Sequence, residues 1–226
     1  MATVCLLLAA PMWTAAQSDE ADRVREAGTV VGEIMSAPDR EIPRSVLDKA
    51  EAIAVFPGTL KGAFIVGAHR GKGVISVRNH SVGQWSLPAF VTMTGGSIGA
   101  QVGGQAVDLV LIIMNRRGLE NLLRNQFKIG GEASATAGPV GRDAEASTDI
   151  QLRAQILSYS RSRGLFAGVS LKGSAIRQDV DSNERFYGKR FHTRDIVLDG
   201  KATQPDSTGA AATEWIEVVT KYAPSR

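Results

Sequence analysis

Alternating apolar and polar positions in the first half of the chain predict β-strands. Residues 52–56 form a short apolar run that suits a buried strand. Residues 63–68 alternate in the manner of a second strand, and β-branched residues resume at Val74. The sequence Arg70-Gly71-Lys72-Gly73 separates these last two runs and predicts a tight turn that joins antiparallel strands.

Apolar residues at spacings of three and four predict helices near both ends and in the middle of the chain. The first helix begins at a cap on Ser18 or Asp19 and ends before Pro38. It carries at least as many acids as bases, which favours packing on the domain's own sheet over the alternative of binding a membrane surface. Further helices are expected at 44–51, at 115–124 with three leucines facing inward, and at 213–222 after a linker from 200.

Residues 90–114 are apolar and contain regularly placed glycines. The spacing of four between Gly95, Gly99 and Gly103 also suits a membrane helix, but polar residues such as Asp108 interrupt any long apolar run. Strands bent at glycine fit better. We therefore predict an α+β fold with a curved, barrel-like antiparallel sheet that is rich in glycine and flanked by N-terminal, central and C-terminal helices.

Residues 150–177 contain no acid and predict two more strands, at 156–160 and 164–171. The sequence Ser160-Arg161-Ser162-Arg163-Gly164 has the composition of a turn between them. Trp85 and Tyr159 are expected in the core, although either could also lie at a lipid interface.

The first 17 residues predict a secretory signal peptide. Residues 4–10 are apolar but too few to span a bilayer, and Thr14-Ala15-Ala16 suits cleavage before residue 17 or 18. An uncleaved anchor is the alternative. Cleavage removes Cys5, the single cysteine, and with it disulfide and thiolate chemistry. We expect residues 18–226 to form one exported domain, periplasmic or extracellular, with its core at about 24–188.

Charge is unevenly distributed along the chain. Residues 52–107 lack Asp and Glu, and residues 52–178 carry 14 Lys or Arg against 6 Asp or Glu. A basic centre between acidic ends favours an anionic partner, although ordinary solvated side chains give the same composition.

One motif indicates catalysis. Residues 95–99, Gly-Gly-Ser-Ile-Gly, match the G-x-S-x-G motif of serine hydrolases, with Ser97 as the nucleophile. His192 with Asp149 or Asp181 could complete a triad. The residues that follow predict a strand instead of the required helix, so a serine hydrolase is the least favoured alternative.

Other chemistries have weaker signals. The three histidines lack metal-ligand spacing, no phosphate-binding loop of the Walker type is present, and aromatic residues make up only 6% of the chain, few for stacking on nucleic acid bases. We therefore expect no metal, no cofactor and no nucleic acid partner.

Short motifs also occur in a characteristic order over roughly residues 24–188. They are Ile42-Pro43, Ala54-Val55-Phe56-Pro57, Lys61-Gly62-Ala63-Phe64, Gly71-Lys72-Gly73, Trp85-Ser86-Leu87-Pro88, Gly99-Ala100-Gln101-Val102-Gly103, Asp108-Leu109-Val110-Leu111, Gly138-Pro139-Val140-Gly141-Arg142, residues 158–168 and Tyr187-Gly188. This order resembles the SYLF domain, a lipid- and actin-binding family. The resemblance implies binding of phosphoinositide-type anionic lipids and, in fungal members, of actin. We do not expect actin as a partner of an exported protein.

The resemblance also implies a basic surface that holds lipid head groups. Six cations, most of them at predicted turns, could form it: Lys61, Arg70, Lys72, Arg161, Arg163 and Lys172. Lysine and arginine bind phosphate oxygens, and nearby glycines let backbone N–H groups approach. We therefore expect a non-enzymatic domain that binds anionic phospholipid at a membrane surface. The alternative is a structural or stress-related envelope module without lipid affinity.

Overall fold

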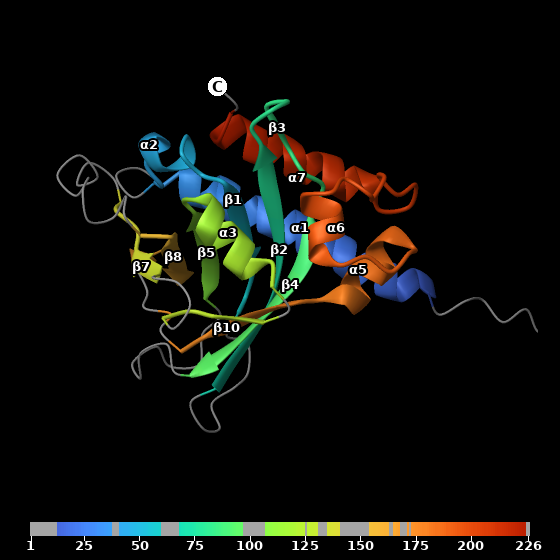
Figure 1. Ribbon diagram of the computed structural model, residues 1–226, viewed down its shortest axis with the longest axis horizontal. Helices are drawn as coiled ribbons and strands as arrows, with labels where there is room; N and C mark the ends of the chain where they lie inside the picture. The colour runs from blue at the N-terminus through green and yellow to red at the C-terminus, as the bar shows by residue number, and fades with distance from the viewer. Residues whose placement is uncertain are drawn as a thin grey trace, which may run out of the picture.

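A strongly curled β-sheet with helices on both faces makes up the computed structural model (Figure 1). The structure describes residues 13–37, 41–59, 68–96, 107–124, 126–130, 135–140, 154–162, 165–167, 171 and 173–224. The predicted α+β fold with a curved sheet is confirmed.

The described strands form one sheet in the order β6-β10-β4-β2-β1-β5-β8-β7, with β3 on β2 and β9 on β8. Their bounds are β1 Ala52–Phe56, β2 Ala68–Asn79, β3 Gln84–Trp85, β4 Ala89–Gly96, β5 Asp108–Ile113, β6 Gln126–Lys128, β7 Ala135–Ala137, β8 Ile156–Ser162, β9 Leu165–Ala167 and β10 Ala175–Gln178. Neighbouring strands are antiparallel except β7 and β8, which are parallel. The expectation of an entirely antiparallel sheet is wrong at this one pair.

Six helices are described: α1 Trp13–Met35, α2 Arg44–Leu47, α3 Arg116–Leu122, α5 Val180–Tyr187, α6 Thr193–Val197 and α7 Gly209–Tyr222. The predicted cap at Ser18 or Asp19 is wrong, because helical backbone already begins at Trp13. The sequence pattern also missed α5 and α6, which are too short for a clear apolar period.

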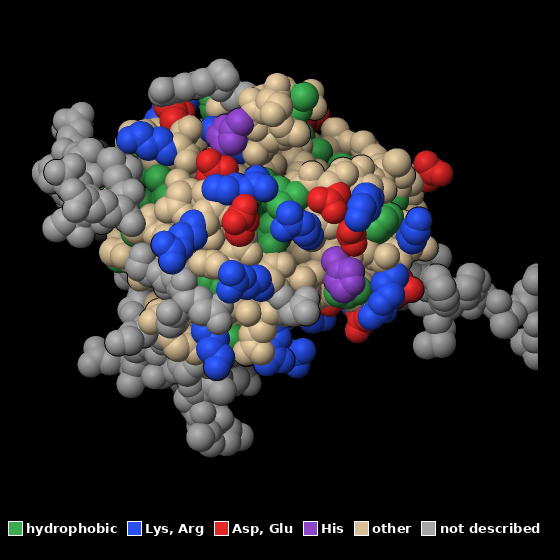
Figure 2. Space-filling model, in the orientation of Figure 1, with side chains coloured by type: hydrophobic (Ala, Val, Ile, Leu, Met, Phe, Trp, Pro, Cys, Tyr) green, Lys and Arg blue, Asp and Glu red, His purple; other side chains and the backbone are tan. Residues whose placement is uncertain are grey.

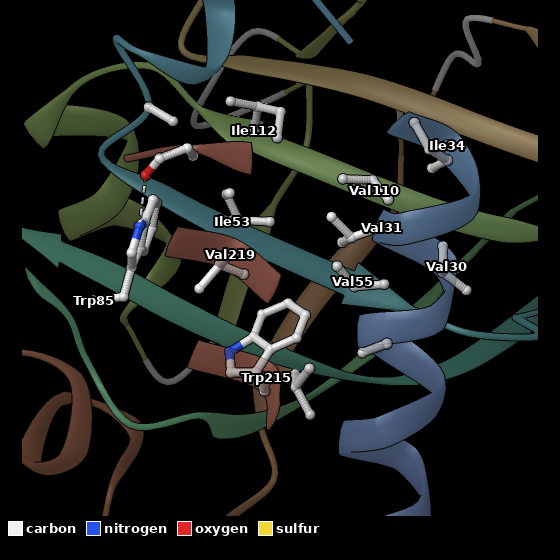
Figure 3. Close-up of a cluster of buried hydrophobic side chains, with 14 of the residues drawn as sticks. Val30, Val31, Ile34, Ile53, Val55, Trp85, Val110, Ile112, Trp215 and Val219 are labelled. Atoms are coloured by element: carbon white, nitrogen blue, oxygen red, sulfur yellow. Dashed lines mark hydrogen bonds between the residues drawn. The ribbon is translucent and has the colours of Figure 1, made fainter. Parts of the chain in front are cut away.

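Both faces of the central strands are buried, which explains their nearly continuous apolar sequence. Ile53 and Val55 belong to a cluster with α1 and α7, whereas Ala54 and Phe56 belong to a second cluster with α3 and α6. Figure 3 shows the first cluster. There, side chains of α1 and α7 pack on β1 and β5; the labelled ones are Val30, Val31, Ile34, Trp215 and Val219 against Ile53, Val55, Val110 and Ile112.

The predicted turn at Arg70-Gly71-Lys72-Gly73 is wrong, because all four residues lie inside strand β2. Glycine is needed there for close packing instead. A Cβ atom on Gly71 would lie 2.6 Å from Cγ2 of Thr59, and one on Gly73 would lie 2.5 Å from Cδ1 of Phe56. The chain segment that leaves β1 thus packs tightly on one face of β2 at the two glycines.

The second predicted turn is shorter than expected. Arg161 and Ser162 continue strand β8, and Ser162 pairs with Leu165 at the start of β9. Two antiparallel strands are therefore present, and the two residues between them lie outside the described residues.

Candidate functional site

The period of two along β2 places Arg70 and Lys72 on one face of the sheet, opposite to the two buried glycines. Across the neighbouring strands this face continues in two rows. Lys72 pairs with Thr92 of β4, which pairs with Arg177 of β10, which pairs with Gln126 of β6. In an antiparallel sheet, residues directly opposite one another share a face.

The second row runs parallel to the first. Arg70 pairs with Thr94, Thr94 with Ala175, and Ala175 with Lys128. We call the two rows together the cationic sheet face; its members are Arg70, Lys72, Thr92, Thr94, Gln126, Lys128, Ala175 and Arg177. The four cations come from strands β2, β10 and β6, which together with β4 are four consecutive strands of the sheet.

The four cations of this face are all exposed. None of them forms an ion pair with another residue in the described part of the chain, and the two rows contain no acid. Nη2 of Arg177 donates a hydrogen bond of 3.0 Å to Oε1 of Gln126, which leaves its positive charge uncompensated. Figure 2 shows Lys and Arg side chains at the lower end of the molecule, where Figure 1 places β10 and the ends of β2 and β4.

The structure thus brings two of the six predicted site residues together, Arg70 and Lys72. Arg161 lies on β8, three strands away in the sheet, where its guanidinium forms an ion pair with Glu33 of α1. The predictions at Lys61, Arg163 and Lys172 lie outside the described residues.

Sequence reasoning missed Lys128 and Arg177 as site residues. Each occurs in a three-residue pattern with a buried centre, Gln126-Phe127-Lys128 and Ala175-Ile176-Arg177. This alternation predicts an exposed face for both cations. The sequence could not show that β10 joins β4 to β6, and this is what places both beside β2.

A groove of about 450 Å³ borders the cationic sheet face. Arg70, Gly71 and Lys72 line it on the sheet side, together with Pro57 and Gly58 from the turn after β1. The middle of α1 lines the other side with Asp19, Asp22, Arg23 and Glu26.

A buried polar network fixes α1 at this position. Glu20 is 2% exposed and accepts hydrogen bonds from Nε of Arg185 at 3.1 Å and from Oγ of Ser182 at 2.9 Å. Arg23 lies 3.9 Å from Asp179 and stacks over the ring of Phe90, 5.2 Å from its centroid. Burial lowers the pKa of Arg23, while Glu20 and Asp179 oppose this shift. The network holds α1 against α5 and β4.

Of the four residues named for the hydrolase alternative, the structure describes Asp181 and His192. Asp181 forms an ion pair of 3.2 Å with Arg190, and His192 is exposed at the start of α6. Ser97 and Asp149 lie outside the described residues.

The described residues contain no group of three or more His, Cys, Asp or Glu side chains arranged to hold a metal ion. None of their helices combines the length and the apolar character needed to cross a bilayer. The segment considered as a membrane helix instead provides strands β4 and β5.

Comparison with known proteins gives one family. The model of the Ysc84 family, described as "Las17-binding protein actin regulator", matches residues 94–222. The chain is 32% identical over 188 residues to SH3 domain-containing YSC84-like protein 1 of Rattus norvegicus, covering 83% of this chain and 53% of that protein. The Homo sapiens protein of the same name is 33% identical over 164 residues, covering 72% and 47%.

A yeast protein is similar to a comparable extent. LAS seventeen-binding protein 3 of Saccharomyces cerevisiae (strain ATCC 204508 / S288c) is 36% identical over 170 residues, covering 74% of this chain and 36% of that protein. The chain thus spans about half, or less, of the length of these relatives, of which the yeast protein is named as a binding protein. The predicted SYLF resemblance is confirmed, and the chain belongs to the Ysc84 family.

Proposed function

We propose that the cationic sheet face binds anionic phospholipid head groups at the surface of an envelope membrane, without catalysing a reaction. The observation that carries this proposal is the pair of cross-strand rows, which gather four exposed cations from three strands with no acid among them. Such a face attracts a negatively charged surface, and each Lys or Arg near an anionic membrane contributes about 1 kcal/mol.

The chemistry of the face suits phosphate groups. Arginine can bind a phosphate through two parallel hydrogen bonds, and lysine adds a compact charge. Thr92 and Thr94 lie between the cations in the two rows and offer hydroxyl donors. A phosphoinositide-type head group is one anionic ligand that would use several of these groups together.

Loss of the four cations is expected to weaken binding to anionic vesicles by more than tenfold. The variant carries Arg70→Gln, Lys72→Gln, Lys128→Gln and Arg177→Gln. All four side chains are exposed, so we expect the fold to be retained. The measurement is co-sedimentation of residues 13–226 with vesicles of neutral lipid or of neutral lipid with added phosphatidylglycerol or phosphoinositide, at low and high salt.

The matched control removes the same charge elsewhere, with Arg44→Gln, Lys49→Gln, Arg117→Gln and Arg124→Gln on or beside α2 and α3. Salt-sensitive binding that falls in the first variant and persists in the control supports the proposal, because ionic screening weakens exposed charge interactions. Equal losses in both variants, or no binding to any vesicle, would refute it. Sedimentation with filamentous actin but with no vesicle would instead favour the activity named in the family description.

A further inference from the structure

The groove beside the cationic sheet face has two walls of opposite charge. Arg70 and Lys72 of β2 form one wall, and Asp19, Asp22 and Glu26 of α1 contribute to the other; all five of these side chains are exposed. Arg23 also lines the α1 wall, but its side chain is largely buried and its charge is paired with Glu20 and Asp179. Asp22 pairs with Arg25 of its own helix at 3.0 Å, and no ion pair in the described part of the chain joins the two walls. The walls therefore face each other across the groove without neutralising one another directly.

The groove is also held in shape by its surroundings. The amide of Gly58 donates to Oδ1 of Asp108 at 2.9 Å, and the amide of Thr59 donates to the carbonyl of Val107 at 2.9 Å. These bonds attach the turn after β1 to the region of β5. On the other wall, the Glu20 network fixes α1, so a ligand would find the two walls already in place.

We propose that this groove binds a phosphoethanolamine group, with its phosphate against Arg70 and Lys72 and its primary ammonium against the carboxylates of α1. This inference rests on the proposed function, because the same two cations belong to the cationic sheet face. A purely anionic head group would meet like charge on the α1 wall, whereas a group with separated negative and positive charges complements both walls.

The lining residues also select the kind of ammonium. A primary ammonium donates three hydrogen bonds, for which carboxylate oxygens are suitable acceptors. A quaternary ammonium such as choline donates none and is typically bound by aromatic rings. No aromatic residue lines the groove in the described part of the chain. The groove therefore favours ethanolamine over choline.

The test compares vesicles of phosphatidylglycerol mixed with phosphatidylethanolamine and vesicles of phosphatidylglycerol mixed with phosphatidylcholine. We expect the wild type to bind the ethanolamine mixture several-fold more tightly. The variant Asp22→Asn with Glu26→Gln is expected to lose this preference and to bind the choline mixture more tightly, since it removes negative charge beside the membrane. General electrostatics alone predicts tighter binding to both mixtures and no change in their ratio.

The matched control is Asp206→Asn with Glu217→Gln, which neutralises two exposed acids outside the groove. It should keep the ethanolamine preference. In a second arm, soluble glycerophosphoethanolamine and glycerophosphocholine are titrated while amide shifts of groove residues are followed by NMR. This arm distinguishes a free phosphoethanolamine compound from a lipid as the source of the ligand.

The outcomes separate the two proposals. An ethanolamine preference that depends on Asp22 and Glu26, in either arm, supports the inference. No such preference in both arms, or a preference that survives in the Asp22 and Glu26 variant, overturns it. Failure to bind the phosphatidylglycerol and phosphatidylcholine mixture better than pure phosphatidylcholine would instead refute the proposed function.

Discussion

Replacement of Arg78 with Met is expected to lower the free energy of unfolding by about 2–4 kcal/mol, because it removes a buried cation that donates hydrogen bonds to three backbone carbonyls. Arg78 lies on β2 and is 5% exposed. Its Nη1 atom donates to the carbonyl of Asp48 at 2.9 Å, and Nη2 donates to the carbonyls of Leu47 and Ala223, each at 3.0 Å.

The acceptors of Arg78 lie at or next to the C-terminal ends of α2 and α7, where backbone carbonyls lack helical partners. A cation at these ends is stabilised by the partial negative charge of the helix termini. The guanidinium also stacks on Trp85, 4.8 Å from the ring centroid, and Trp85 donates its own indole hydrogen bond to Ala223 at 2.9 Å. Burial lowers the pKa of Arg78, while Asp48 and Glu51 oppose this shift. One side chain thus joins the sheet to two helix ends.

The measurement for Arg78 is equilibrium unfolding in urea. Arg78→Lys should give an intermediate loss, because an ammonium keeps the charge but cannot span three carbonyls in a plane. Arg117→Met, at an exposed position on α3, is the control and should change stability by less than about 0.5 kcal/mol. A loss for Arg78→Met as small as that of the control would show that the buried bonds of Arg78 do not stabilise the fold.

A single methyl group at Gly138 is expected to cost about 3 kcal/mol of unfolding free energy. A Cβ atom there would overlap the Cζ and hydroxyl atoms of Tyr159, whose side chain is 1% exposed in the core. Gly138 follows strand β7, and its amide donates to the carbonyl of Ser158 at 3.0 Å, so its backbone cannot easily move away. The same burial raises the pKa of the Tyr159 hydroxyl.

A double-mutant cycle tests the cause of this cost. Tyr159→Leu removes the overlapping atoms, so Gly138→Ala should cost less than about 1 kcal/mol in that background. Gly32→Ala on α1 is the matched control. No atom lies within 4 Å of its added Cβ, and alanine should raise stability by about 0.5–1 kcal/mol in a helix. Equal costs of Gly138→Ala in both backgrounds would contradict contact with Tyr159 as the cause.

The local pattern of residues 70–73 predicts a turn, but the tertiary structure places them inside strand β2. Glycine between two apolar runs is typical of a turn, and in an isolated segment that interpretation is reasonable. In the protein, the glycines instead meet Thr59 and Phe56, residues that precede them by more than ten positions. Glycine is required at these two positions because a distant segment packs closely against them, and not because the backbone forms a turn there.

In the candidate site, too, the local sequence identified some features and the tertiary structure decided others. The sequence indicated Arg70 and Lys72 as cations of a predicted turn in a segment without acids, whereas in the structure their exposure follows from the alternation of the strand. Arg161 has the same local signal, yet it pairs with Glu33 on a helix far away in the sequence. Which cations form ion pairs depends on the acids that the fold brings within reach of them, and this cannot be read from neighbouring residues.

The sequence by itself determined the family, through its ordered short motifs. It also determined the mixed α and β composition and the approximate positions of the long amphipathic and apolar elements, because periodic burial is a local property. Strand β1 lies at the predicted residues, and the three leucines of the central helix are buried as expected. Only the tertiary structure decided the strand order, which places Lys128 and Arg177 beside β2, and the position of α1, whose acids face Arg70 and Lys72 across the groove. Both depend on contacts between segments distant in the chain, and such contacts leave no periodic signal in either segment alone.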